Sequence, residues 1–284
     1  MNNNKDKDIC EQFKLQFKPN YISSANEKEL FQFSFSEKIP LILKGPTGCG
    51  KTRFIEYMAY KLDLPLITVS CHEDLTAGDL IGRYIFKGEE MVWEDGPLTL
   101  AVRYGGICYL DEIVEARNDT TVIIHSLTDD RRMLYIDKTQ EVVRAHKDFM
   151  MVMSYNPGYQ NIMKDLKQST KQRFMSLIFD HPQIEVENKI VKSETGLDSL
   201  VSEQLAVMGQ KIRNLKGFGL SEGVSSRLLV YAGRLIKAGV EPFEACRVAI
   251  AQSLTDEEHM IDSICDIIKL FFKDKKTDNE KESK

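Results

Sequence analysis

The amino-acid sequence predicts an α/β protein in which a parallel sheet covered by helices is followed by a smaller, all-helical domain. Short apolar runs alternate with helical patterns between residues 41 and 179, as strands and crossover helices do in a parallel sheet. The first of these runs ends in a Gly-rich turn. After His181-Pro182 the pattern is helical only, through about Phe272.

Five short apolar runs are expected to form the sheet, because strands buried on both faces read as continuous apolar segments. A helix is expected from Lys51, since Phe54, Met58 and Leu62 stand four residues apart and form one apolar stripe. The expected strands are 41–43, 66–69, 107–110, 149–153 and 174–179.

Two segments interrupt this alternation and are predicted to be β-hairpin inserts. The first has strands at 84–86 and 91–93, before the third strand of the sheet. The second has strands at 134–136 and 141–143, before the fourth. The predicted organisation is an N-terminal arm with one short helix (1–35), an α/β domain (36–181), a smaller α-helical domain (182–272) and a disordered charged tail (273–284).

Composition excludes several classes of protein. With 42% hydrophobic and 29% charged residues, the 284-residue chain has enough apolar side chains for a packed core. The net charge of -5 argues against a general affinity for nucleic acid. No apolar run approaches the roughly 18 residues that span a bilayer, and the polar start does not resemble a signal peptide. We therefore expect a cytoplasmic protein without a membrane span.

The six cysteines agree with that compartment, because they are scattered and form no C-x-x-C pair. Cys71, His72 and Glu73 are three metal-ligand types in a row. Adjacent strand residues point to opposite faces, so these three side chains are not expected to converge on one ion.

A phosphate-binding loop follows the first strand. Residues 45–52 match G-x-x-x-x-G-K-[ST] at every fixed position, between a predicted strand and a predicted helix. Backbone N–H groups at this helix start can surround phosphate oxygens. Lys51 would reach the β- and γ-phosphates of ATP, and the Thr52 hydroxyl would bind Mg²⁺. The predicted nucleotide-binding residues are Gly45, Pro46, Thr47, Gly48, Cys49, Gly50, Lys51, Thr52 and Arg53.

Two carboxylates end the third predicted strand. Asp111 and Glu112 follow an apolar run about sixty residues after the phosphate-binding loop, at the sheet edge where ligands bind in open α/β sheets. Asp111 is predicted to hold Mg²⁺, and Glu112 to orient or deprotonate the attacking water.

Three further polar residues complete the predicted catalytic set. Asn156 follows the fourth strand and is a candidate for hydrogen bonding to the γ-phosphate or the lytic water; the alternative is a turn-forming Asn before Pro. Arg173 precedes the fifth strand and is either a solvated charge or an arginine finger for a neighbouring subunit. Arg227 opens a helix in the helical region and is a candidate for closing over the nucleotide.

With these elements in order, the chain resembles an AAA+ P-loop ATPase of the MoxR branch, and within it the CbbQ/NirQ/NorQ family. The resemblance runs from about Leu41 to Ala249. It implies that Asn156 is the sensor 1 residue, Arg173 the arginine finger and Arg227 the sensor 2 residue, and that the hairpins are the helix-2 insert and the pre-sensor 1 hairpin. The segments that carry it are GPTGCGKTRF (45–54), SCHEDLTAGDLIGRY (70–84), VWEDGPLTLAVRYGGICYLDEIVEARNDTT (92–121), HSLTDDRRMLYI (125–136), MVMSYNPGYQ (151–160), LKQSTKQRF (166–174) and EGVSSRLLVYAGRLI (222–236).

The resemblance also implies how such a protein works. Members of this family form hexameric rings with ATP at the subunit interfaces and act with a partner that carries a von Willebrand factor A domain. They are chaperone-like activases, one type for inhibited Rubisco and another for nitric oxide reductase. One departure is Lys171, where an R-Q-R-F run would have Arg.

The sequence therefore predicts a Mg²⁺-dependent ATPase that remodels a client enzyme. Two other readings remain: a nucleotide-gated scaffold with little hydrolysis, and a DNA translocase-like motor. The presence of Glu112 and Arg173 argues against the scaffold, and the net charge of -5 argues against the motor. The hairpin around Lys87-Gly88-Glu89 is the candidate client-contacting loop, although Tyr84, Phe86 and Trp93 are also of the type that packs a hairpin onto its domain.

Overall fold

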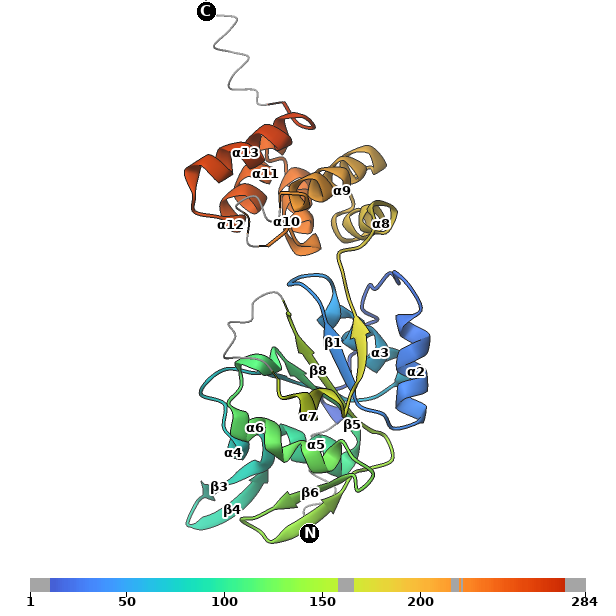
Figure 1. Cartoon of the computed structure of the whole chain (residues 1–284), viewed down its shortest axis with the longest axis vertical. Helices are drawn as coiled ribbons and strands as arrows, with labels where there is room; N and C mark the ends of the chain where they lie inside the picture. Colours follow the sequence, from blue (N-terminus) through green and yellow to red (C-terminus); the bar gives the residue numbers. More distant parts are fainter. Residues whose placement is uncertain (1–10, 158–165, 216–219, 221, 274–284) are drawn as a thin grey trace, which may run out of the picture. The chain divides into compact units, whose positions relative to one another are not determined.

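The computed structural model describes residues 11–157, 166–215, 220 and 222–273 (Figure 1). Most of the tail predicted over 273–284 lies outside these ranges. The chain divides into two compact units, a sheet unit and a helical unit. The sheet unit consists of Met1–Tyr21, Ala25–Gly45 and Lys51–Phe179, and the helical unit of Ile22–Ser24, Pro46–Gly50 and Asp180–Lys284.

The sheet unit is built on a five-stranded parallel sheet with the order β2-β5-β8-β1-β9. All five predicted strands are confirmed. The phosphate-loop strand β1 lies between β8 and β9, and β8 separates it from β5. The carboxyl ends of β1, β5 and β8 therefore meet at one edge. The strands are β1 (Leu41–Lys44), β2 (Leu66–Ser70), β5 (Gly106–Asp111), β8 (Phe149–Tyr155) and β9 (Met175–Ile178).

Helices cover both faces of this sheet. Successive residues of each strand point to opposite faces, so alternate residues pack on the two sides of the sheet. On one face, Ile42, Cys108 and Met151 join a core cluster with Leu98 and other residues of α5 (Pro97–Tyr104). The intervening residues, among them Tyr109, are buried as well. Every residue of β8 is buried, which explains its uninterrupted apolar run.

The segment before β1 packs on the sheet unit through α2 (Glu27–Ser36). Phe31 is fully buried and meets Phe54 of α3 (Lys51–Leu62) edge to face, with ring centroids 5.6 Å apart. Glu27 is buried as well, because its carboxylate accepts hydrogen bonds from the Tyr21 hydroxyl and the Ala25 backbone N–H, both at 2.8 Å. A helix was expected within 1–35, and α2 runs one residue beyond that range.

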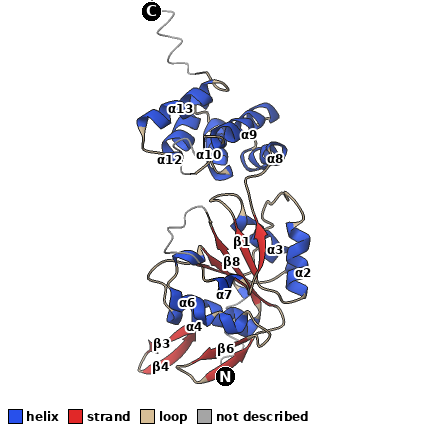
Figure 2. Ribbon diagram, viewed as in Figure 1, coloured by secondary structure: helices blue, strands red, loops and turns tan. Residues whose placement is uncertain are grey.

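Both predicted hairpins are present and form separate two-stranded antiparallel sheets (Figure 2). Helix α5 contacts both of them. Gly88 turns the first hairpin with φ 69°, a left-handed conformation that glycine adopts without strain. The strands are longer than predicted: β3 (Gly82–Lys87) pairs with β4 (Glu90–Asp95), and β6 (Met133–Ile136) with β7 (Glu141–Arg144).

Short helices connect these elements. Thr76 and Asp79 form a reciprocal capping box at the start of α4, which fixes the chain before the first hairpin. Helix α7 is a single turn. The connecting helices are α4 (Ala77–Ile81), the 3₁₀ turn η1 (Ile113–Glu115), α6 (Asn118–Ile123), the 3₁₀ turn η2 (His125–Leu127) and α7 (Gln168–Lys171).

The described part of the helical unit packs around one apolar core, which includes Leu205, Met208, Leu229, Ile250 and Ile264. Its helices are α8 (Ile184–Thr195), α9 (Ser199–Arg213), α10 (Ser226–Lys237), α11 (Pro242–Cys246), the π-helix η3 (Arg247–Ala251), α12 (Gln252–Leu254) and α13 (Glu258–Lys269). None of the helices in the described ranges is long and apolar enough to cross a membrane.

A buried ion pair ties three helices of this unit together. Glu187 of α8 is fully buried and receives a two-pronged hydrogen bond from Arg213 of α9, at 2.6 and 2.7 Å. The Ser226 hydroxyl of α10 donates to the same carboxylate at 2.5 Å. Removing one partner leaves a buried charge uncompensated, which is more costly than losing an exposed pair.

We therefore expect Glu187→Gln to lower the free energy of unfolding of the helical unit by about 3 kcal/mol. Denaturant unfolding followed by circular dichroism measures this. Asp266→Asn is the matched control, because it breaks an exposed pair with Lys269 in the same unit and should cost less than about 1 kcal/mol. Equal losses in the two variants would contradict the role given to the buried pair.

Candidate active site at the carboxyl edge of the sheet

The loop between β1 and α3 has the backbone that phosphate binding requires. Gly48 and Gly50 have φ of 68° and 100°, in the left-handed region that favours glycine. At Gly45 an added Cβ would collide with the backbone carbonyl oxygen of Phe179. The Lys51 ammonium donates a 2.8 Å hydrogen bond to the Gly45 carbonyl, so the side chain folds back over the loop. Cys49 is buried and Arg53 is exposed.

Thr52 and Asp111, the two predicted Mg²⁺ residues, lie together. Thr52 stands in the first turn of α3, and its hydroxyl donates to Asp111 Oδ2 at 3.3 Å. Asp111 is the last residue of β5. In the described ranges no group of three or more His, Cys, Asp or Glu side chains is arranged to hold a metal. A hydroxyl and one carboxylate fit Mg²⁺, which takes oxygen ligands and draws the others from nucleotide phosphates and water.

Asp111 is further bonded by two hydroxyl groups. Tyr109 donates to Asp111 Oδ1 at 2.8 Å, and Ser154 of β8 donates to the same oxygen. Burial, reinforced by the Asp111 charge, raises the pKa of Tyr109, so the phenol keeps its proton and acts as the donor. Sequence reasoning missed both residues. The signal for Tyr109 was its place two residues before Asp111, which puts both side chains on one face of the strand.

Glu112 has a strained backbone. Its φ of 55° and ψ of 45° place a non-glycine residue in the left-handed region, at a cost of about 1 kcal/mol. Its N–H donates to the Ser154 hydroxyl at 3.3 Å. The side chain is exposed, directly after the end of β5. Such strain is commonly found at functional sites.

Asn156 is the first residue after β8, the strand between β1 and β5. It therefore lies at the sheet edge that carries the phosphate-binding loop and Asp111. It is partly buried. Its sensor 1 role remains a prediction.

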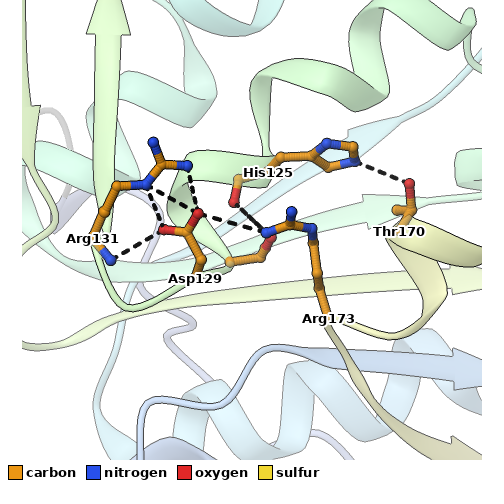
Figure 3. Close-up of polar contacts among 6 residues, drawn as sticks. His125, Asp129, Arg131, Thr170 and Arg173 are labelled. Atoms are coloured by element: carbon orange, nitrogen blue, oxygen red, sulfur yellow. Dashed lines mark hydrogen bonds and ion pairs between the residues drawn. The ribbon is translucent and has the colours of Figure 1, made fainter.

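Arg173 is held by neighbouring groups in the sheet unit (Figure 3). Its guanidinium lies 3.6 Å from Asp129 and donates to the His125 carbonyl at 3.4 Å. Arg131 approaches the same Asp129 carboxylate from the other side, at 2.6 Å. The His125 ring lies 3.0 Å from the Thr170 hydroxyl. Burial, together with the Arg173 charge, lowers the pKa of His125, so the ring is neutral at pH 7.

Lys171 and Arg227 are two further cations named from the sequence, and the Cβ of Arg227 would lie 3.8 Å from a Cβ added at Gly48 of the phosphate-binding loop. Lys171 places its ammonium 6.0 Å from the ring centroid of Tyr155. Arg227 belongs to the helical unit, where it is the second residue of α10 and is exposed. Ser225 caps that helix by accepting a hydrogen bond from the Leu228 N–H.

Comparison with known proteins places this site in a family. Residues 40–174 match the model of an AAA domain of the dynein-related subfamily, and residues 187–271 match the CbbQ/NirQ/NorQ C-terminal model. The protein CbbQ of Hydrogenophilus thermoluteolus is 55% identical over 88% of this chain and 94% of its own length. The chain belongs to the CbbQ/NirQ/NorQ family.

Other members of the CbbQ/NirQ/NorQ family are similarly close. NorQ of Paracoccus denitrificans is 52% identical over 89% of this chain and 94% of its own length. The denitrification regulatory protein NirQ of Pseudomonas aeruginosa is 51% identical over 89% of this chain and 97% of its own length. Among solved structures, a RuvB variant of Thermotoga maritima aligns with a TM-score of 0.55 and 13% identity, over 89% of this chain and 73% of that one, which supports the fold alone. The chain is thus an AAA+ ATPase of this family.

Proposed function

We propose that this ATPase uses Mg²⁺ and ATP to remodel a client enzyme, as a subunit of a hexameric ring that acts with a von Willebrand A-domain partner. The observation that carries the proposal is the group of Thr52, Asp111 and the strained Glu112 at one sheet edge. This arrangement offers oxygen ligands for a hard cation beside a carboxylate of the kind that can act on water.

In this proposal the residues divide the hydrolytic reaction among them. Lys51 and the loop N–H groups bind the β- and γ-phosphates of ATP. Mg²⁺, held by Thr52 and Asp111, would neutralise phosphate charge as the terminal phosphoryl group leaves. Glu112 orients the attacking water and accepts its proton, and Asn156 hydrogen-bonds the γ-phosphate or that water. Arg227 contributes a further positive charge to the nucleotide.

Arg173 is proposed to act on the ATP of a neighbouring subunit. Its ion pair with Asp129 holds the guanidinium in place while the side chain keeps 34% of its surface exposed. An arginine supplied across an interface stabilises the charge of the phosphoryl-transfer transition state. This is the reason for proposing a ring rather than an active monomer.

The two hairpins are proposed to contact the client. Phe86 and Met91 face each other across the first hairpin and are 75% and 60% exposed. Tyr135 and Val142 form an exposed pair across the second. The Tyr84 hydroxyl donates to the Lys138 carbonyl at 3.4 Å and links the hairpins. Exposed apolar pairs of this kind favour a protein partner.

The aromatic residues of the first hairpin thus divide into two groups. Tyr84 and Trp93 meet edge to face with ring centroids 5.2 Å apart, and Trp93 packs on the core. Phe86 is the aromatic residue left outside this packing.

The proposed client is Rubisco or nitric oxide reductase, the two types of client enzyme associated with the family. The proposed compartment is the cytoplasm, where five described free thiols would stay reduced.

Phe86→Ser is expected to lower client activation at least about fivefold, because an exposed aromatic anchor contributes more than about 1 kcal/mol to a protein contact. ATP hydrolysis without client should change less than about twofold, since the hairpin lies outside the predicted nucleotide-binding set. Recovery of client activity and phosphate release measure the two effects. Phe33→Ser is the matched control, because Phe33 is 69% exposed and belongs to α2 rather than to a hairpin. Full activation by Phe86→Ser would refute the assignment.

A further inference from the structure

Two buried hydroxyl groups fix the orientation of the Asp111 carboxylate. Tyr109 and Ser154 both donate to Oδ1, so this oxygen has two protein donors. The other oxygen, Oδ2, lies 3.3 Å from the Thr52 hydroxyl. A carboxylate bonded in this way cannot rotate without breaking hydrogen bonds, so the oxygen that faces Thr52 is determined in advance.

Both hydroxyl groups are buried next to Asp111. Tyr109 and Ser154 have no exposed surface, and they belong to the neighbouring strands β5 and β8. A phenylalanine at position 109 would fill the same space as tyrosine without a polar atom to satisfy. The Tyr109 hydroxyl makes its short bond to Asp111 and lies 3.4 Å from the Thr52 hydroxyl.

Ser154 has a second hydrogen bond, to the backbone of Glu112, the catalytic glutamate of the proposed mechanism. Its hydroxyl accepts the N–H of Glu112 at 3.3 Å while it donates to Asp111. One hydroxyl on β8 therefore connects both residues at the end of β5. It supports the left-handed backbone of Glu112, which is unfavourable without such partners.

We propose that Tyr109 and Ser154 are positioning residues for the Mg²⁺ of the bound nucleotide: together they hold the Asp111 carboxylate with Oδ2 toward Thr52, and Ser154 also holds Glu112. The inference rests on the proposed function, because it requires that Mg²⁺ bind with the nucleotide. Hydrogen-bond partners of metal-binding side chains commonly change metal affinity about 10- to 100-fold when they are removed.

The test compares nucleotide affinity with and without metal in the full chain. Fluorescent ADP is titrated against the wild type, Tyr109→Phe and Ser154→Ala, once in EDTA and once in excess Mg²⁺. The readout is the ratio of the two dissociation constants, which isolates the contribution of the metal. Thr99→Val is the matched control, because its fully buried hydroxyl donates to the Ile81 carbonyl at 2.6 Å and does not touch Asp111.

The wild type should bind ADP more tightly with Mg²⁺ than in EDTA. Tyr109→Phe should reduce that ratio about tenfold and leave the affinity in EDTA within about twofold, because the phosphate contacts persist. Ser154→Ala should reduce the ratio similarly and also lower kcat more than Tyr109→Phe does, because it releases Glu112. Thr99→Val should retain the wild-type ratio.

Two results would overturn the inference, and they are distinguishable. If the wild type shows the Mg²⁺ dependence and Tyr109→Phe retains it in full, the positioning role is refuted while the proposed function stands. If the wild type itself binds ADP equally with and without Mg²⁺, the proposed use of the metal fails and the inference fails with it. Tyr109→Phe keeps the volume of the buried ring, so it decides the question even if Ser154→Ala does not fold.

Discussion

Arg173→Ala should lower kcat for ATP hydrolysis about 10³-fold or more, because a trans-acting arginine acts on transition-state charge. Its affinity for ATP should stay within about twofold of the wild type, since the finger contributes little to ground-state binding. Phosphate release and nucleotide titration of the assembled protein measure the two quantities. Arg131→Ala is the matched control, because Arg131 bonds the same Asp129 and is 63% exposed. It should reduce kcat far less.

Mixing two inactive variants tests whether Arg173 acts across subunits. Arg173→Ala subunits retain Glu112, and Glu112→Gln subunits retain Arg173. In the proposed ring, a mixture of the two variants would contain interfaces at which an intact Glu112 meets an intact Arg173 of the neighbour, so the mixture should recover part of the activity. A mixture as inactive as its components, or an equal loss in Arg131→Ala, would refute the assignment.

Glu112→Gln should lower kcat at least about 10²-fold, because it removes the carboxylate that is proposed to accept the proton of the attacking water. Nucleotide affinity should be retained, since the substitution is isosteric and the backbone bond from Glu112 N–H to Ser154 remains. Single-turnover hydrolysis and nucleotide titration measure both effects. Glu115→Gln, three residues later on the turn η1, is the matched control and should hydrolyse ATP normally. A Glu112→Gln variant with wild-type turnover would exclude Glu112 as the base.

The central strands of the sheet were predictable because they are short and buried on both faces. The runs at 41–43 and 149–153 are continuously apolar, so they indicate strands without an alternating apolar and polar pattern. The observed strands β1 and β8 extend one and two residues beyond these runs. The common edge of Thr52, Asp111 and Asn156 also followed from the sequence, since the carboxyl ends of parallel strands meet at one edge.

The partners of Asp111 were not predictable, because they depend on register. Leu110 pairs with Met153, and this places Ser154 beside Asp111. A shift of one residue would turn Ser154 to the opposite face of the sheet. The contact of Arg173 with Asp129 joins residues 44 positions apart (173 − 129) and depends on packing in the same way. The sequence of helix α2 shows only a weak apolar stripe, because its buried residues are Glu27, Phe31 and Ser34, and only Phe31 is apolar.

The central claim is that hydrolysis at this site drives recovery of a client enzyme. The most direct measurement follows client activity and phosphate release together, in reactions that contain inhibited Rubisco or inactive nitric oxide reductase, the von Willebrand A-domain partner and ATP. The wild type should restore activity of one client in step with phosphate release, whereas Glu112→Gln should bind ATP and restore none. Full recovery with Glu112→Gln, or with the wild type and a non-hydrolysable ATP analogue, would contradict the claim and favour a nucleotide-gated scaffold.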